Sequence, residues 1–171
     1  MKAQKVLGIV GWKNSGKTTL VEALVREMTA RGLRVSTIKH AHHSFDIDVP
    51  GKDSYRHREA GAREVIVVSA ERWALIHELR TVSEPPLDEL IVKLAPCDLV
   101  LVEGLKQGTH PKIEVARFKR EEGLIADRDG AILAVATDNA TLAGHHRALP
   151  LNDTPAISSF IRQHFRLPEH G

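Results

Sequence analysis

The segment from Gly11 to Thr18 reads GWKNSGKT and fits the phosphate-binding template G-x-x-x-x-G-K-[ST] at every fixed position. In this template the loop curls so that successive backbone N–H groups point at phosphate oxygens. The lysine, here Lys17, reaches the β- and γ-phosphates, and the hydroxyl of Thr18 coordinates Mg²⁺. The sequence therefore predicts a nucleotide-phosphate site formed by Gly11, Asn14, Ser15, Gly16, Lys17 and Thr18.

A carboxylate at the end of a buried strand is the next candidate. The run from Asp98 to Val102 is the most apolar strand candidate in the chain, and Glu103 ends it. Open parallel sheets bind ligands beyond the carboxyl ends of their strands, where a carboxylate can hold Mg²⁺ or a water bound to it. Glu103 is thus the Walker B candidate, whereas Asp98 starts the same strand and is expected to be a local turn residue.

The polar segment from His40 to Gly51 follows a strand predicted at residues 33–39. We expect it to be a loop on the nucleotide side of the sheet. Within it, Asp46 and Asp48 could supply a Mg²⁺ ligand or orient an attacking water. The group His40, His42 and His43 could instead bind nickel, copper or zinc, for which imidazole is a suitable ligand. Ordinary hydrogen bonding within a polar loop is the simpler role for these histidines.

Asp138 follows the last predicted buried strand, residues 131–137. Nucleotide-binding α/β proteins often recognise the base at this place. A carboxylate can accept hydrogen bonds from N1–H and the 2-amino group of guanine, and adenine offers no such pair. Asp138 is therefore the candidate guanine-recognition residue.

These residues need a scaffold of alternating strands and helices. The short β-branched run 6–10 precedes the loop, apolar residues over 17–31 recur at helical spacing, and residues 33–39 form the next strand candidate. This order is typical of a parallel sheet with a right-handed crossover. We expect an α/β fold: a single P-loop nucleotide-binding domain over residues 1–171, with three layers, a mostly parallel sheet and some antiparallel edge strands.

The segment from Lys112 to Phe118 alternates apolar and polar residues, which predicts a half-exposed edge strand. Free edges pair readily with another chain. This strand is therefore one candidate edge for pairing with another chain, although the sequence does not identify the face of a dimer.

Composition excludes several classes of protein. The 171 residues are 42% apolar and 27% charged, with a formal net charge of +2 from interspersed acids and bases. The sequence has neither a basic stripe nor an apolar segment that could cross a bilayer, so nucleic acid and membranes are not expected partners. The single cysteine, Cys97, excludes an internal disulfide, and the N-terminal run lacks a secretory pattern. A cytoplasmic location is expected.

Four segments carry a family resemblance: GWKNSGKTTL, IKHAHHSFDIDVPGKDSYRHREAGA, ERWAL and DLVLVEGLK. Together they resemble the MobB family of adapter proteins in molybdopterin-guanine dinucleotide biosynthesis, over roughly residues 6–138. The resemblance implies a GTP-binding homodimer with at most slow Mg²⁺-dependent GTP hydrolysis. Such proteins assist the guanylyltransferase MobA in attaching GMP to molybdopterin, and act with proteins that deliver the molybdenum cofactor.

The resemblance also implies roles for individual residues. Phosphate and magnesium binding would fall to Gly16, Lys17, Thr18 and Thr19. Asp46 and Glu103 would complete the ion site, which makes Lys17, Asp46 and Glu103 the candidate catalytic residues. Family members tend to have an aromatic residue after the Glu-Gly pair, where this chain has Leu105.

Two other classes of protein share parts of this pattern. A metallochaperone GTPase that loads nickel or zinc would use the histidines at 40–43 as its metal site. An ATP-dependent small-molecule enzyme resembling dethiobiotin synthetase would share the buried strand that ends in Val-Glu-Gly. The first predicts stoichiometric metal binding, and the second predicts rapid phosphoryl transfer with a preference for ATP.

Overall fold

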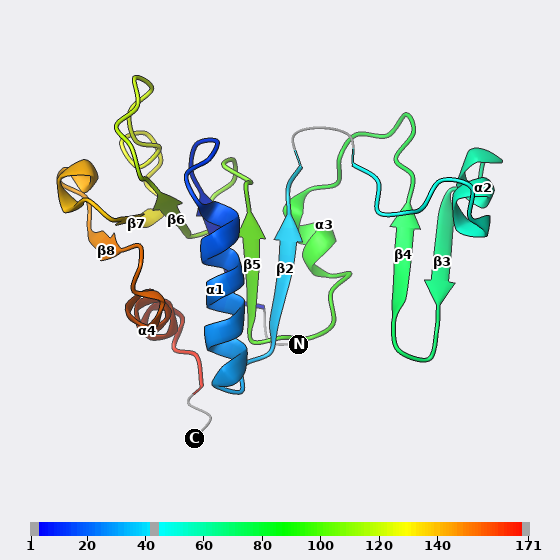
Figure 1. The fold of residues 1–171 in the computed structure, drawn as a ribbon, viewed down its shortest axis with the longest axis horizontal. Coiled ribbons are helices and arrows are strands. Elements are labelled where there is room, and N and C mark those ends of the chain that lie inside the picture. Colours follow the sequence, from blue (N-terminus) through cyan, green and yellow to red (C-terminus); the bar gives the residue numbers. More distant parts are fainter. Residues whose placement is uncertain (1–3, 42–44, 169–171) are drawn as a thin grey trace. The chain divides into compact units, whose positions relative to one another are not determined.

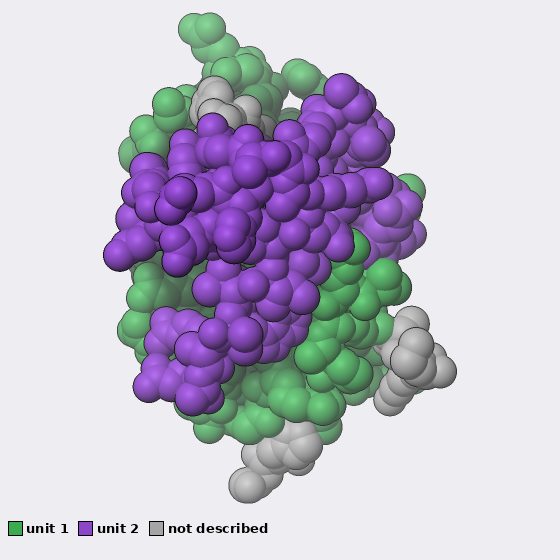
Figure 2. Space-filling view, turned by 90° about the vertical axis from the view of Figure 1, so that its right-hand side faces the viewer, with its two compact units in different colours: residues 1–40, 91–171 green, residues 41–90 purple. Residues whose placement is uncertain are grey.

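The computed structural model describes residues 4–41 and 45–168. The chain divides into two compact units, shown in different colours in Figure 2: unit 1 comprises residues 1–40 and 91–171, and unit 2 comprises residues 41–90. Among the described residues, no helix is both long and apolar enough to cross a membrane.

Unit 1 contains a six-stranded sheet in the order β2-β5-β1-β6-β7-β8, in which every neighbouring pair is parallel. Its strands are β1 (Val6–Val10), β2 (Val35–Lys39), β5 (Leu99–Glu103), β6 (Lys112–Val115), β7 (Ile132–Thr137) and β8 (Ala148–Pro150). Because all six run the same way, their carboxyl ends meet at one edge (Figure 1). This confirms the α/β fold with a mostly parallel sheet, while the antiparallel strands form a separate pair in unit 2.

Two helices pack on one face of this sheet and lie side by side, α1 (Lys17–Ala30) and α4 (Thr154–Phe165) (Figure 1). Apolar residues spaced three and four apart put one stripe of α1 against the sheet, so that Leu24 and Met28 are fully buried. Ile157 and Ile161 do the same from α4. The side chains of both helices join those of the strands in one hydrophobic core.

The prediction of an edge strand at Lys112–Phe118 is wrong. β6 lies inside the sheet, between β1 and β7, and all four of its residues are buried. The alternation misleads because the polar side chains of this strand are themselves buried and have hydrogen-bond partners. Lys112 Nζ donates to Gly108 O at 2.6 Å and to Asp129 Oδ2 at 2.9 Å, and Glu114 accepts two backbone N–H groups. β6 therefore has no free edge at which a second chain could pair.

Unit 2 contains α2 (Asp53–Glu59) and an antiparallel hairpin of β3 (Glu64–Val68) and β4 (Trp73–His77). The short helix α3 (Leu87–Ile91) spans the boundary between the units. In the part of unit 2 that the structure describes, Val65 is the one buried apolar side chain. The opposite face of the hairpin carries Ile66 and Val68 beside their cross-strand partners Leu75 and Trp73, and all four are exposed. We call these four residues the Ile66 face.

Candidate functional site

The phosphate loop connects the carboxyl end of β1 to the first residue of α1. Gly11 has φ 151°, and a Cβ there would lie 2.5 Å from Val115 O and 2.7 Å from Ser15 Oγ. Gly16 has φ 98°, and its Cβ would approach Arg117 Nε to 3.0 Å. The backbone conformation therefore favours glycine at both positions, and at Gly11 a side chain would also collide with the backbone of Val115.

The amino end of α1 is free of a capping side chain. Gly16 is its N-cap residue, and no side chain among the described residues caps its first turn with a hydrogen bond. The first N–H groups of a helix have no intrahelical partner, and the helix dipole places partial positive charge there, so this end can bind an anion.

Lys17 crosses this loop rather than pointing into solvent. Its Nζ donates to Gly11 O at 3.1 Å and to Trp12 O at 2.8 Å. Burial lowers the pKa of Lys17; the nearby Glu103 carboxylate raises it in part, and Lys106 and Lys39 lower it further. The ammonium group thus lies in a partly desolvated position where an arriving anion would stabilise its charged form.

Thr18 and Glu103 form the polar centre of the site. β1 and β5 pair with Ile9 opposite Glu103, which brings the end of β5 beside the start of α1. Thr18 Oγ1 donates to Glu103 Oε1 at 2.6 Å, and Lys39 Nζ lies 3.5 Å from the same carboxylate oxygen. A hydroxyl and a carboxylate oxygen are the ligand types that Mg²⁺ prefers, so this pair fits the predicted ion.

The third predicted ion ligand, Asp46, lies in unit 2. There it accepts hydrogen bonds from Arg58 at 2.8 and 3.1 Å, and Arg58 also contacts Asp48 and Glu78. The hydrogen bonds from Arg58 lower the pKa of Asp46. Asp46 is thus held as a carboxylate in its own unit, and its part in the ion site stays a prediction.

A pocket of about 220 Å³ lies in unit 1 next to the phosphate loop. Its wall includes Trp12 and Ser15 from the loop and residues 115–120 that follow β6. The loop is fastened to the β6–β7 connection because Trp12 Nε1 donates to Gly123 O at 3.0 Å and Arg120 donates to Lys13 O at 2.8 Å. The hydroxyl of Ser15 is buried and has no hydrogen-bond partner in the described part of the chain. It is therefore available to a bound group.

Arg117 is a site residue that the sequence reasoning missed. It follows β6, lies against Gly16, and its Nη1 is 4.0 Å from Asp138 Oδ2. Asp138 follows β7 at the same edge of the sheet, as predicted. Polar residues just after a strand are the signal that could have found Arg117, because the same rule identified Glu103 and Asp138.

Of the predicted group His40, His42 and His43, the structure describes His40. His42 and His43 lie outside the described residues. The backbone N–H of His40 donates to Glu103 O at 2.9 Å, which continues the β2–β5 ladder.

Comparisons with known proteins decide the family. The family model described as molybdopterin guanine dinucleotide synthesis protein B, or MobB, matches residues 6–138. The chain belongs to the MobB family. It is 45% identical over 158 residues to a molybdopterin-guanine dinucleotide biosynthesis adapter protein of Haemophilus influenzae, covering 91% of this chain and 86% of that protein. The Escherichia coli protein of the same name is 40% identical over 164 residues, covering 91% and 90% of the two chains.

Solved MobB structures share the fold. A crystal structure of molybdopterin-guanine biosynthesis protein B superimposes with a TM-score of 0.72 at 30% identity, covering 94% of this chain and 99% of that one. A MobB homologue from Bacillus stearothermophilus gives 0.68 at 28% identity, with 94% and 97% covered. The chain is thus a MobB-type adapter of molybdopterin-guanine dinucleotide biosynthesis, and this confirms the resemblance seen in its sequence.

Proposed function

We propose that this MobB-family chain is a GTP-binding adapter that assists MobA in converting molybdopterin to its guanine dinucleotide form. The observation that carries the proposal is the 2.6 Å contact between Thr18 and Glu103 at the foot of an uncapped helix. This contact brings together a hydroxyl and a carboxylate that would serve as oxygen ligands of a magnesium–nucleotide site at the phosphate loop, in a chain whose relatives are named as adapters of this biosynthesis.

Each group at the phosphate loop would have its own task in nucleotide binding. The backbone of the loop, with the first-turn N–H groups of Lys17, Thr18 and Thr19, would hold the phosphates. The ammonium of Lys17 would exchange its two carbonyl partners for phosphate oxygens, and Thr18 and Glu103 would hold Mg²⁺, with Asp46 as a further ligand. The ion would neutralise phosphate charge. Asp138 would recognise guanine.

Slow hydrolysis at most is expected of such a site. Glu103 is bonded to Thr18 and lies near Lys39, so in this arrangement it serves the ion position rather than an attacking water. Binding GTP would therefore mark a state of the adapter that MobA and cofactor-delivery proteins recognise, and MobA would perform the guanylyl transfer. The proposed location is the cytoplasm, where Cys97 remains a thiol.

A homodimer is the proposed assembly, and the Ile66 face is its proposed contact. Ile66, Val68 and Trp73 are 64%, 72% and 66% exposed. A contiguous apolar face on a hairpin is typical of an interaction surface. A second copy of this chain would cover it.

The experiment that tests the proposal combines binding with activity. GTP and ATP are titrated in Mg²⁺ buffer into the wild-type chain, Lys17→Ala and Lys13→Ala, and each protein is then added to a MobA reaction with GTP and molybdopterin. Losing charge-assisted hydrogen bonds of about 1.5–3 kcal/mol each should weaken GTP binding by Lys17→Ala by more than about tenfold and remove its stimulation of MobA.

Lys13→Ala is the matched control, because it removes a lysine of the same loop at a variable position of the template. It should retain both GTP affinity and stimulation. Wild-type protein that binds no GTP, or prefers ATP, would overturn the nucleotide assignment. GTP binding with no increase in guanylated product and no capture of MobA would overturn the adapter role while leaving the nucleotide site in place.

A further inference from the structure

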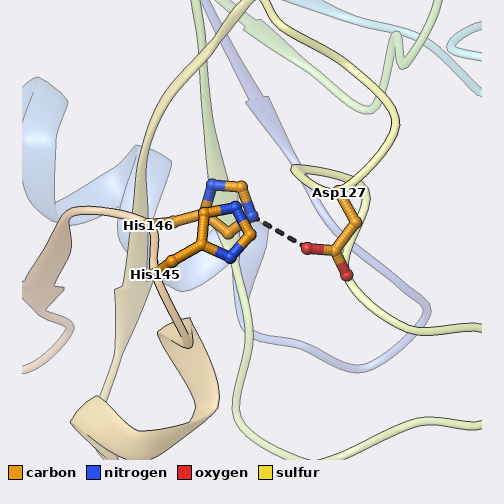
Figure 3. A group of neighbouring side chains, drawn as sticks. All are labelled: Asp127, His145 and His146. Carbon is orange, nitrogen blue, oxygen red and sulfur yellow. Dashed lines mark hydrogen bonds and ion pairs between the residues drawn. The ribbon is translucent and has the colours of Figure 1, made fainter.

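Asp127, His145 and His146 gather in unit 1, away from the Thr18–Glu103 pair. One ligand atom from each lies within 4.8 Å of the others. His146 Nε2 is 2.8 Å from Asp127 Oδ1, and the two imidazole rings have centroids 4.0 Å apart. Figure 3 shows the carboxylate pointing at the two neighbouring rings. Two imidazoles and one carboxylate thus converge from two segments that are distant in sequence.

A tight turn puts the adjacent histidines in this position. The short helix η1 (Ala140–Ala143) ends at Gly144, whose φ of 58° and ψ of −120° are those of the first central residue of a type II′ turn. The turn closes with a hydrogen bond of 2.9 Å from His146 N to Ala143 O. Glycine is strongly favoured at such a position, so the sequence Gly-His-His builds the turn and places both rings at its end.

The buried carboxylate of Glu114 holds the segment that carries Asp127. Glu114 of β6 is fully buried and accepts hydrogen bonds from the N–H groups of Ile125 at 3.0 Å and Ala126 at 2.9 Å. These residues directly precede Asp127, so the segment that carries its carboxylate is attached to the centre of the sheet.

We propose that Asp127, His145 and His146 form a binding site for a divalent transition metal, with zinc as the best fit. Two histidines and a carboxylate are a zinc ligand set that leaves a fourth position for water or another ligand. Tetrahedral zinc with bonds of about 2.0–2.1 Å separates its ligand atoms by about 3.3 Å, so the three side chains need only small movements. A hard cation such as Mg²⁺ prefers oxygen ligands and would not select two imidazoles.

A metal at this position would affect the pocket beside the phosphate loop. Asp127 and Gly144 both line the pocket beside the phosphate loop. A bound zinc would link the β6–β7 connection to the segment that follows η1, which are two parts of the same wall. A nitrogen, oxygen or sulfur atom of a pocket ligand could occupy the fourth coordination position of the metal.

The test uses the full chain without an affinity tag, freed of metal with a chelator. Zinc is titrated calorimetrically, and cobalt is added in parallel because tetrahedral cobalt with nitrogen and oxygen ligands absorbs visible light. We expect one zinc per chain at this site. His145→Ala should weaken it by more than about tenfold, since even outer-shell changes at zinc sites cost that much. His145 is exposed, so this change leaves the fold intact.

The double variant His42→Ala with His43→Ala is the matched control, because it removes the other pair of adjacent histidines. It should keep both the tight zinc site and the cobalt spectrum. Asp127→Asn provides a second loss of affinity at the proposed site. Zinc binding that survives His145→Ala, or is lost in the 42/43 variant, would overturn the proposal. So would the absence of a stoichiometric site, in which case Asp127 and His146 form a hydrogen-bonded pair only.

Discussion

The two units of the chain are stabilised by different kinds of contact. Unit 1 buries a continuous apolar core between its sheet and two helices, and its strand ends carry polar residues with short, defined contacts. Unit 2 buries only Val65 among its described apolar residues, and its centre is Arg58, which contacts Asp46, Asp48 and Glu78. Its Ile66 face remains exposed. Unit 1 thus has the properties of a rigid support for chemistry, and unit 2 those of an interaction module.

The two units therefore suit different parts of the proposed function. A ligand site needs side chains held at defined distances, and a packed core supplies that support at the edge of a parallel sheet. An adapter also needs a surface that another protein can cover, and an apolar hairpin face provides it. The contrast can be tested through stability, assembly and pH dependence.

The largest effect is expected from opening the core of unit 1. Leu24 is fully buried, so Leu24→Ala should lower the free energy of unfolding by about 2–5 kcal/mol. Val82 in unit 2 is 57% exposed, and Val82→Ala should change the free energy of unfolding by less than about 0.5 kcal/mol. Urea denaturation measures both. Equal losses in the two variants would contradict the contrast between the units.

A smaller effect is expected on assembly. Introducing Ile66→Asp together with Val68→Asp places two charges on the Ile66 face and should raise the dissociation constant of the proposed dimer by more than about tenfold. Val82→Asp changes an exposed valine outside this face and serves as the control. Analytical ultracentrifugation gives the dissociation constants. A dimer that tolerates the double variant would move the interface to another surface.

The smallest expected effect is on how the free energy of unfolding depends on pH. Burial raises the pKa of Glu114, although the N–H groups of Ile125 and Ala126 lower it in part. A raised native pKa means that the folded chain holds this proton more tightly than the unfolded chain, so stability falls as pH rises from about 4 towards 7. Relative to Glu114→Gln, the wild-type free energy of unfolding should therefore decrease over this range.

Asp46 should show the opposite sign. Its pKa is lowered by Arg58, so its contribution is present above the unfolded pKa and is lost as the pH falls. Relative to Asp46→Asn, the wild-type chain should become less stable on acidification. Denaturation curves at several pH values measure both slopes, and two slopes of the same sign would contradict the assignment of these environments.

Local sequence was sufficient where a short motif fixes its own geometry. The glycines of the phosphate loop require the turn that the template describes, and Glu103 follows from the rule that ligands bind beyond the carboxyl ends of parallel strands. Asp98 was also expected at the opposite end of β5, and it does bond there to Arg34, with Arg34 N 2.8 Å from Asp98 Oδ2. For the phosphate loop and Glu103, one strand and its neighbouring residues are sufficient, whereas the partner of Asp98 lies 64 residues away in the sequence.

Sequence pattern failed at β6 and was silent on the histidine cluster. Lys112 and Glu114 look like the exposed positions of an edge strand, because their partners Asp129 and the N–H groups at 125–126 come 11 to 17 residues later. His145 and His146 gain a third potential ligand from Asp127, 19 residues before His146. Neither hydrophobic periodicity nor motif spacing predicts contacts between residues this far apart in the sequence.

Short motifs were enough to identify the phosphate loop, the place of Glu103 and the family of this protein, because such motifs can be recognised in the chain itself. Four other features follow only from the folded arrangement: β6 is central, Arg117 lies against Gly16, Asp127 meets two histidines, and the Ile66 face is exposed. Burial and pairing depend on which distant segments the fold brings together, so residues that are close together in the chain do not reveal them.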